Sequence, residues 1–408
     1  MPDIRDHGLQ LRTVRTIPSL RIAELPLQQV DAPACHEPRL VPVPDQIDHA
    51  PAQLSSRTSI PSVSARVVYG GPDGPARRLR DLLEERIDAV GPGGSINWMT
   101  YYFRDERLAD ALIRARLRGV NVRLCLEGRP RNRRVNSEVI RRLADPVKGL
   151  GKGLRIVQHI LPLHLHTKIY CFSDPQPTAY IGSFNPSGNE PENTKIISDI
   201  GDQDRGHNLL VNITDPEIVA ELNERVVIMH GNPVFRPARA RDACVHAGGM
   251  EMLFFPLVGR NPLIDRLDAL KSGSVLRIAA SHVRDSDVAR TLARLVGRGV
   301  HVQLLTGGTR RRTPGRIIRQ LISSGVNVFR FSHPEQLPMH AKFMLAESPS
   351  GSWAAFGSYN LTKTSRWLNH ELLAFSSDPQ LLDSLDQRWA GIIQDPATVH
   401  EPRGRQAF

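Results

Sequence analysis

The sequence predicts an α/β protein made of two tandem α/β/α domains that arose by duplication and share one crevice. Three observations support this fold class: a pair of short motifs occurs twice, longer stretches recur at nearly constant spacing, and strand-like segments alternate with helix-like ones. The expected domains comprise residues 65–240 and 241–400. Residues 1–64 are rich in proline and lack hydrophobic periodicity, so we expect them to form a disordered leader.

The short motifs are a His-x-Lys string followed by a Gly-Ser-x-Asn string. They read His166-Thr167-Lys168 with Gly182-Ser183-Phe184-Asn185, and His340-Ala341-Lys342 with Gly357-Ser358-Tyr359-Asn360. With 15 histidines and seven lysines in 408 residues, chance predicts only about 0.26 His-x-Lys strings. Lysine is scarce in this arginine-rich chain, and its compact ammonium group suits a single phosphate oxygen better than the planar guanidinium does.

The duplication extends well beyond these motifs. Three further pairs match, namely Arg104-Asp105 with Arg284-Asp285, Gly119–Leu124 with Gly299–Leu304, and His207–Leu210 with His370–Leu373. The first two pairs are separated by 180 residues, the motif histidines by 174 and the last pair by 163. Offsets that hold or drift by a few residues indicate two copies of one unit with loops of different length.

Each copy has the same expected order of elements. In copy one we expect strands at 95–100, 121–126, 155–160, 168–172 and 179–182, with a helix at 107–118. In copy two we expect strands at 275–280, 301–305, 326–331, 342–345 and 354–357, with a helix at 287–298. The strand, helix and strand at the start of each copy predict a crossover unit and therefore a largely parallel sheet covered by helices. Each motif histidine precedes a strand and each Gly-Ser-x-Asn follows one, so both sets can converge in one crevice.

These motifs resemble the signature of the phospholipase D superfamily, His-x-Lys-x4-Asp followed by Gly-Ser-x-Asn, which two-domain members carry twice. The resemblance covers roughly residues 66 to 395. It departs from the family five residues after each lysine, where the family has an aspartate usually described as structural. This chain has Ser173 there, next to Asp174, in copy one and Glu347 in copy two.

Such a crevice can act on a phosphodiester without a metal or other cofactor. One imidazole attacks phosphorus and forms a phosphohistidine, while the other protonates the leaving alkoxide and then activates water or an alcohol. Lys168 and Lys342 would neutralise the non-bridging oxygens. The expected substrate-binding donors are Ser183, Asn185, Ser358 and Asn360, and Gly182 and Gly357 would leave room for the backbone to approach.

The roles of the two histidines depend on their partners. When the two copies are aligned, Asn208 of copy one corresponds to Glu371 of copy two. If Glu371 orients His340 and Asn208 orients His166, then His340 is the better acid and His166 the better nucleophile, because a carboxylate favours the protonated ring. Family precedent, in which the N-terminal histidine is usually the nucleophile, agrees. Glu190 or Glu192 could serve His166 instead.

A formal net charge of +11 indicates an anionic partner. Arginines gather in equivalent loops of the two copies, at Arg129, Arg131, Arg133 and Arg134, and at Arg310, Arg311, Arg312 and Arg316, where they could form two basic rims. A phospholipid diester is the first substrate expectation, with DNA or RNA as the alternative and a non-catalytic anion-binding scaffold as the third. Without an apolar run long enough to span a bilayer or act as a signal peptide, we expect a cytoplasmic monomer that touches membranes only at their surface.

Overall fold

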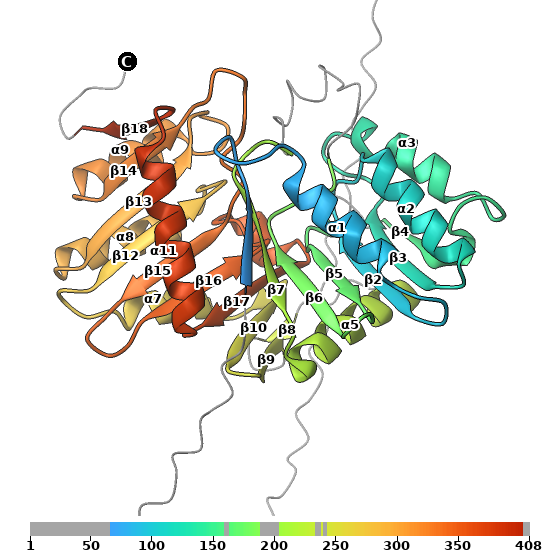
Figure 1. The fold of residues 1–408 in the computed structure, drawn as a ribbon. Coiled ribbons are helices and arrows are strands. Elements are labelled where there is room, and N and C mark those ends of the chain that lie inside the picture. Colours follow the sequence, from blue (N-terminus) through green and yellow to red (C-terminus); the bar gives the residue numbers. More distant parts are fainter. Residues whose placement is uncertain (1–65, 159–162, 188–203, 233–237, 240–242, 403–408) are drawn as a thin grey trace, which may run out of the picture. The chain divides into compact units, whose positions relative to one another are not determined.

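The computed structural model describes residues 66–158, 163–187, 204–232, 238–239 and 243–402 (Figure 1). The expected leader, residues 1–64, lies outside the described residues, as do Glu190 and Glu192. The described chain forms a mixed α/β fold in which each copy of the repeat builds its own sheet.

The described residues of copy one form the first seven strands and four α-helices. They are β1 (Arg66–Gly70), α1 (Arg78–Asp88), β2 (Ser95–Thr100), α2 (Glu106–Leu117), β3 (Asn121–Glu127), α3 (Arg134–Leu143), the 3₁₀ turn η1 (Gly151–Gly153), β4 (Leu154–Val157), β5 (Ile169–Phe172), β6 (Thr178–Gly182), β7 (Asn208–Ile213) and α5 (Pro216–Gly231). The expected strands and helix of this copy are confirmed, with boundaries that differ by at most three residues.

Copy two follows the same order. Its elements are β8 (Ala238–Arg239), β9 (Cys244–Ala247), β10 (Met250–Phe255), β11 (Leu257–Val258), α7 (Pro262–Asp268), β12 (Val275–Ala280), α8 (Ser286–Gly297), β13 (His301–Gly307), α9 (Gly315–Ser323), β14 (Asn327–Phe331), β15 (Phe343–Glu347), β16 (Trp353–Gly357), α10 (Lys363–Trp367), β17 (Glu371–Ser376), α11 (Pro379–Gln394) and β18 (Thr398–Glu401). The expected elements of copy two are likewise confirmed.

The two sheets have equivalent strand orders, which confirms the duplication. The first sheet runs β1-β7-β6-β5-β2-β3-β4, and the second contains β10-β17-β16-β15-β12-β13-β14 with β9 and β18 added at its ends. A separate two-stranded sheet joins β8 and β11. The fold therefore consists of two tandem α/β units of the same topology.

The expectation of largely parallel sheets is wrong. Only the pairs β2/β3 and β3/β4, and their equivalents β12/β13 and β13/β14, are parallel, and the other pairs within the two sheets are antiparallel. The reason lies in the connections: five residues join β5 to β6 and β15 to β16, too few for the helical crossover that parallel neighbours need. Each sheet is therefore mixed.

The repeated Arg-Asp pairs begin equivalent helices. The carboxylate of Asp105 accepts the backbone N–H of Leu108 at 2.9 Å at the start of α2. The carboxylate of Asp285 accepts the N–H of Asp287 at 2.9 Å at the start of α8. Side-chain oxygens at this position satisfy N–H groups that the first helical turn leaves without partners.

Helices cover the outer faces of both sheets, and the inner faces share one core. Helices α1, α2 and α3 pack on one side of the first sheet, and α7, α8 and α9 on one side of the second. The shared core includes Ile218 from α5, Leu385 from α11 and strand residues of both sheets such as Ile169 and Phe343. This continuous core holds the ends of β5 and β15, and with them the two His-x-Lys segments, next to each other.

Candidate active site

Each His-x-Lys segment is hydrogen-bonded to the other copy. The backbone N–H of His166 donates to the carbonyl of His370 at 2.9 Å, and that of His370 donates to the carbonyl of His164 at 2.9 Å. Reciprocally, the N–H of His340 donates to the carbonyl of His207 at 3.0 Å. The residue after each bridging histidine, Glu371 or Asn208, therefore lies beside the motif histidine of the opposite copy.

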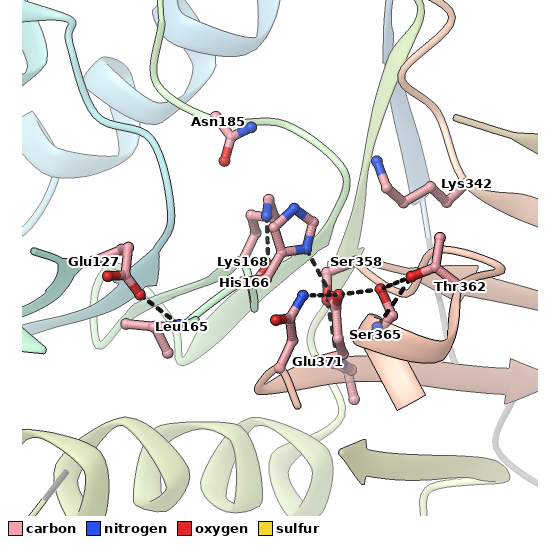
Figure 2. A network of polar contacts seen from close by, with 12 residues as sticks. Glu127, Leu165, His166, Lys168, Asn185, Lys342, Ser358, Thr362, Ser365 and Glu371 are labelled. Atoms are coloured by element: carbon pink, nitrogen blue, oxygen red, sulfur yellow. Dashed lines mark hydrogen bonds and ion pairs between the residues drawn. The ribbon is translucent and has the colours of Figure 1, made fainter. Parts of the chain in front are cut away.

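The carboxylate of Glu371 orients His166 (Figure 2). Its Oε2 accepts Nδ1–H of His166 at 2.8 Å and the hydroxyl of Ser358 at 2.6 Å. Its Oε1 accepts the hydroxyl of Ser365 at 2.7 Å and the amide of Asn369 at 3.3 Å. This fully buried carboxylate has four donors around it, which stabilise its charge and fix the plane of the imidazole.

Asn208 takes the corresponding place beside His340. Its Oδ1 accepts Nδ1–H of His340 at 2.8 Å and the hydroxyl of Ser183 at 3.0 Å. The partners expected from the sequence, Glu371 for His340 and Asn208 for His166, are therefore exchanged. The physical reason is that the bridge between the copies carries each of these side chains across to the other histidine.

The motif serines make contacts other than those expected, whereas the motif glycines leave room for a neighbouring backbone. The hydroxyl protons of Ser183 and Ser358 go to Asn208 and Glu371, and each hydroxyl also accepts a backbone N–H at 3.0 Å, so these serines hold the partners of the histidines. A side chain at Gly182 or Gly357 would collide with the carbonyl of Leu209 or Leu372. Both glycines are therefore needed for close approach of the neighbouring strand, and Gly357 also has a φ of 143°.

The two motif lysines are buried and anchored in the same way. The ammonium of Lys168 donates to the carbonyl of His166, and that of Lys342 donates to the carbonyl of His340 at 2.7 Å. Lys168 also lies over the ring of Tyr101, with Nζ 5.5 Å from the ring centroid. An ammonium group has three protons, so this hydrogen bond leaves each lysine further protons to donate.

Both histidines open into one cavity of about 750 Å³. Asn185 and Asn360 line it, as expected for substrate donors, and the Nδ1 bonds leave Nε2 of each imidazole for a substrate. The basic rims are confirmed in part: of the arginines in the two loops, Arg131, Arg311 and Arg312 line the cavity. The cavity thus brings together side chains of both copies.

Several site residues escaped the sequence analysis. Tyr101 packs on His166 with 4.9 Å between ring centroids, and its hydroxyl accepts the N–H of Arg131 at 2.7 Å. Glu127 accepts the N–H of Leu165 at 2.7 Å and so fixes the start of the His166 segment. His282 lines the cavity and occupies the repeat position of Tyr102, two residues before the matched Arg-Asp pair. That position relative to a repeated motif was the signal that could have identified His282.

Ser173 and Glu347, which stand where the family signature has an aspartate, both make contacts with a neighbouring strand. Ser173 accepts the N–H of Ser95 at 2.7 Å and donates to Asp174 at 2.6 Å, while Glu347 pairs with Arg277 on the neighbouring strand. Both positions therefore join adjacent strands.

Burial of several basic groups together lowers their affinity for protons. Burial lowers the pKa of His166 to about 4 against the opposing effect of Glu371, with Lys168 adding to the decrease. Burial lowers the pKa of Lys168 to about 7, again opposed by Glu371. Burial and Lys342 hold the pKa of His340 well below its usual range. Burial would raise the pKa of Glu371, but His166 and Lys168 hold it below its usual value.

We therefore expect anions to bind this site with proton uptake. A bound dianion favours the charged form of Lys168, whose pKa is about 7 in the empty site. Below that pH the lysine is already charged, and above it each binding event must take up a proton, so affinity should fall as pH rises. Sulfate, which remains a dianion from pH 6 to 9, should lose up to about tenfold in affinity per pH unit for each proton taken up.

Calorimetry in two buffers of different ionisation enthalpy would measure the protons taken up with sulfate. Lys168→Met should bind sulfate more weakly and with a flatter pH dependence. Equal affinity at pH 6 and pH 9, with no proton uptake, would contradict this account of the site.

Comparisons with known proteins agree with this architecture. Residues 91–226 and 263–392 match the family model described as cardiolipin synthase, PLD-like domain, which covers more than half of the chain. The chain belongs to the phospholipase D superfamily. Among curated protein sequences none matches it.

Two solved structures show the same fold. Phosphatidylserine synthase of Haemophilus influenzae Rd KW20 is similar with a TM-score of 0.58 and 13% identity, over 82% of this chain and 87% of that one. Polyphosphate kinase of Porphyromonas gingivalis is similar with a TM-score of 0.56 and 16% identity, over 83% of this chain and 48% of the kinase. This chain thus spans about half the length of the kinase.

The described residues contain neither a membrane-spanning helix nor a cluster of metal-binding side chains. No described helix is both long and apolar enough to traverse a bilayer. Within the same residues, no group of three or more His, Cys, Asp or Glu side chains is placed to hold a metal ion.

Proposed function

We propose that this chain hydrolyses or transfers the phosphodiester of a phospholipid through a phosphohistidine intermediate, using its own side chains in place of a metal ion. The observation that carries the proposal is the pair of imidazoles, one from each copy, that open into one cavity with Nδ1 tied and Nε2 left for substrate. A nucleophile and an acid that each have an orienting partner form the usual arrangement for covalent catalysis.

His166 is the proposed nucleophile, as family precedent implies, although its partner is Glu371 and not Asn208. The phosphorylated ring carries a positive charge with its proton on Nδ1, and the carboxylate of Glu371 lies 2.8 Å from that nitrogen. The amide oxygen of Asn208 offers His340 no full charge, so His340 gives up its proton more readily. The carboxylate would thus stabilise the charged intermediate, and the negative charge of the bound diester would support the proton that His340 needs in the first step.

The two steps follow from these roles. In the first, Nε2 of His166 bonds to phosphorus, the bond to the leaving oxygen breaks, and His340 gives that oxygen its proton. In the second, His340 takes a proton from water or an alcohol, whose oxygen bonds to phosphorus and releases His166. Lys168, Lys342, Asn185 and Asn360 would bind the non-bridging oxygens as negative charge builds on them.

A phospholipid is the first choice of substrate, and a nucleic acid is the second. The family model that matches is described as a cardiolipin synthase domain, and one similar structure is a phosphatidylserine synthase. The strongly basic cavity lining supports the nucleic-acid alternative, because a phosphate backbone is bound chiefly by such groups. The third alternative, an anion-binding scaffold without catalysis, predicts no turnover of any diester.

The test is turnover in excess EDTA of three substrates: bis(p-nitrophenyl) phosphate, phospholipid in vesicles and plasmid or single-stranded DNA. We expect turnover of the generic diester and of phospholipid at rates that EDTA leaves unchanged, because lysine and asparagine side chains stabilise the charge. Loss of activity in EDTA with recovery in Mg²⁺ or Zn²⁺ would overturn the proposed chemistry. Cleavage of DNA with no action on vesicles would select the alternative substrate.

A further inference from the structure

The cavity lining is positively charged without any carboxylate among its described residues. Five arginine or lysine side chains line it, Arg131, Arg284, Arg311, Arg312 and Lys363, together with five histidines, His164, His166, His282, His333 and His340. The carboxylate of Glu371 lies behind His166, to which it is hydrogen-bonded. A single phosphodiester carries one negative charge, fewer than the five arginine and lysine side chains that line the cavity. These side chains can therefore bind additional negative charge on the ligand.

Two of these arginines, Arg311 and Arg312, and His333 lie in one part of the cavity, which we call the His340 arm. It is formed by Thr309, Arg311, Arg312, Ser332, His333 and Gln336, from the loops after β13 and β14. Arg312 fixes this arm beside the catalytic histidine. Its guanidinium donates to the hydroxyl of Ser281 at 2.8 Å and to the carbonyl of Met339, the residue before His340, at 3.3 Å.

The arm has only a partial counterpart in copy one. The two copies are in register through Gly128 and Gly308, whose N–H groups donate to equivalent strands, at Val157 and Phe331. This register pairs Arg131 with Arg311, but it places Asn132 opposite Arg312. The core of the site thus has equivalents in both copies, whereas among the described residues the charge of Arg312 beside His340 has no equivalent in copy one.

The proposed mechanism assigns the arm a ligand. In an in-line displacement the attacking and leaving atoms lie on opposite sides of phosphorus. If His166 attacks, the leaving oxygen lies next to its acid, His340, and the leaving group extends into the His340 arm. An incoming alcohol would occupy the same place in the second step. A choline or ethanolamine group would there meet like charge, whereas a phosphate would meet arginines that bind it in bidentate fashion.

We infer that the His340 arm binds a second phosphate, carried by the alcohol that leaves or enters at the scissile phosphorus. This inference rests on the proposed function and narrows it: the substrate is a phospholipid whose head group itself carries a phosphate.

The test compares three phospholipids with identical acyl chains in micelles of a neutral detergent. Their head groups are glycerol phosphate, glycerol and choline. We expect kcat/KM for the glycerol phosphate lipid to exceed that for the glycerol lipid by about tenfold or more, the factor that a charge-assisted hydrogen bond supplies, with the choline lipid lowest. Each lipid is diluted in neutral detergent, so the micelle surface carries little charge. A higher kcat/KM for the glycerol phosphate lipid would then not come from attraction of the basic protein to a charged surface.

Four variants locate the effect. Arg312→Asn, which installs the copy-one residue, and Arg311→Gln should each reduce the ratio of kcat/KM for the glycerol phosphate and glycerol lipids by about tenfold. Arg131→Gln, the register equivalent of Arg311, and Arg316→Gln, an exposed residue outside the cavity, should keep that ratio within about twofold. Arg311 is exposed, so its variant remains informative if Arg312→Asn fails to fold.

The outcomes separate this inference from the proposed function. Equal kcat/KM for the three lipids, or an equal loss of preference in Arg131→Gln and Arg311→Gln, would overturn the second-phosphate site while leaving the phosphodiesterase intact. Cleavage of single-stranded DNA faster than any lipid, and its loss in Arg311→Gln, would show that the arm binds nucleic-acid phosphates instead. No turnover of any diester by the wild type would overturn the proposed function itself.

Discussion

His340→Ala incubated with a p-nitrophenyl phosphodiester should accumulate a covalent phosphoryl adduct on His166, and His166→Ala should accumulate none. p-Nitrophenolate leaves without a proton, so the first step can proceed without the acid. The second step stalls because no base activates water. Mass spectrometry of samples quenched and held at alkaline pH, where phosphohistidine survives, would locate the adduct.

Steady-state turnover should fall in both variants to less than about a tenth of the wild-type rate, because nucleophile and acid act as a unit and their losses do not add. Both proteins should keep their unfolding temperature to within a few degrees, since each imidazole is partly open to the cavity. An adduct on His340 in the His166→Ala protein would reverse the two roles. Substantial turnover by either variant would contradict the two-histidine mechanism.

Glu371→Gln should reduce kcat by about two to three orders of magnitude, the loss typical of removing one preorganised electrostatic partner. Glutamine keeps the shape of the side chain but removes the charge that lies 2.8 Å from Nδ1 of His166. The phosphorylated ring then lacks its counter-charge, and the buried lysines lose the negative group that supports their protonation. Turnover of both p-nitrophenyl and alkyl diesters should therefore be lost, because the defect lies in formation of the intermediate.

Asn208→Ala is the matched control, since Asn208 holds the same position beside His340. In the first step it should slow cleavage of alkyl diesters strongly and the initial burst of p-nitrophenolate much less, because only an alkoxide leaving group needs the proton of His340. Thermal unfolding and circular dichroism would show whether either variant loses structure. If Asn208→Ala and Glu371→Gln respond alike to the leaving group, the assignment of different roles to the two histidines is wrong.

The strand and helix positions were accessible from the sequence because each copy confirmed the other. The helices α2 and α8, and the strands that flank them, were predicted nearly to the residue, since hydrophobic periodicity was reinforced by a repeat at constant spacing. The direction of the strands was not accessible in the same way. Parallel order was inferred from one crossover per copy, while the short β5–β6 and β15–β16 connections make most pairs antiparallel.

The sequence by itself determined the duplication, the superfamily and the histidines and lysines of the site, because these follow from the identity and spacing of residues along the chain. Tertiary structure alone decided which partner serves which histidine. Both pairings satisfy the repeat equally well, and only the backbone bridges of His166 with His370 and of His340 with His207 carry Glu371 and Asn208 across to the opposite copy. Tertiary structure also decided that the motif serines hold those partners and that Arg312 lies beside His340. Such contacts join residues far apart in the chain, so they depend on how the two sheets pack and not on a local sequence pattern.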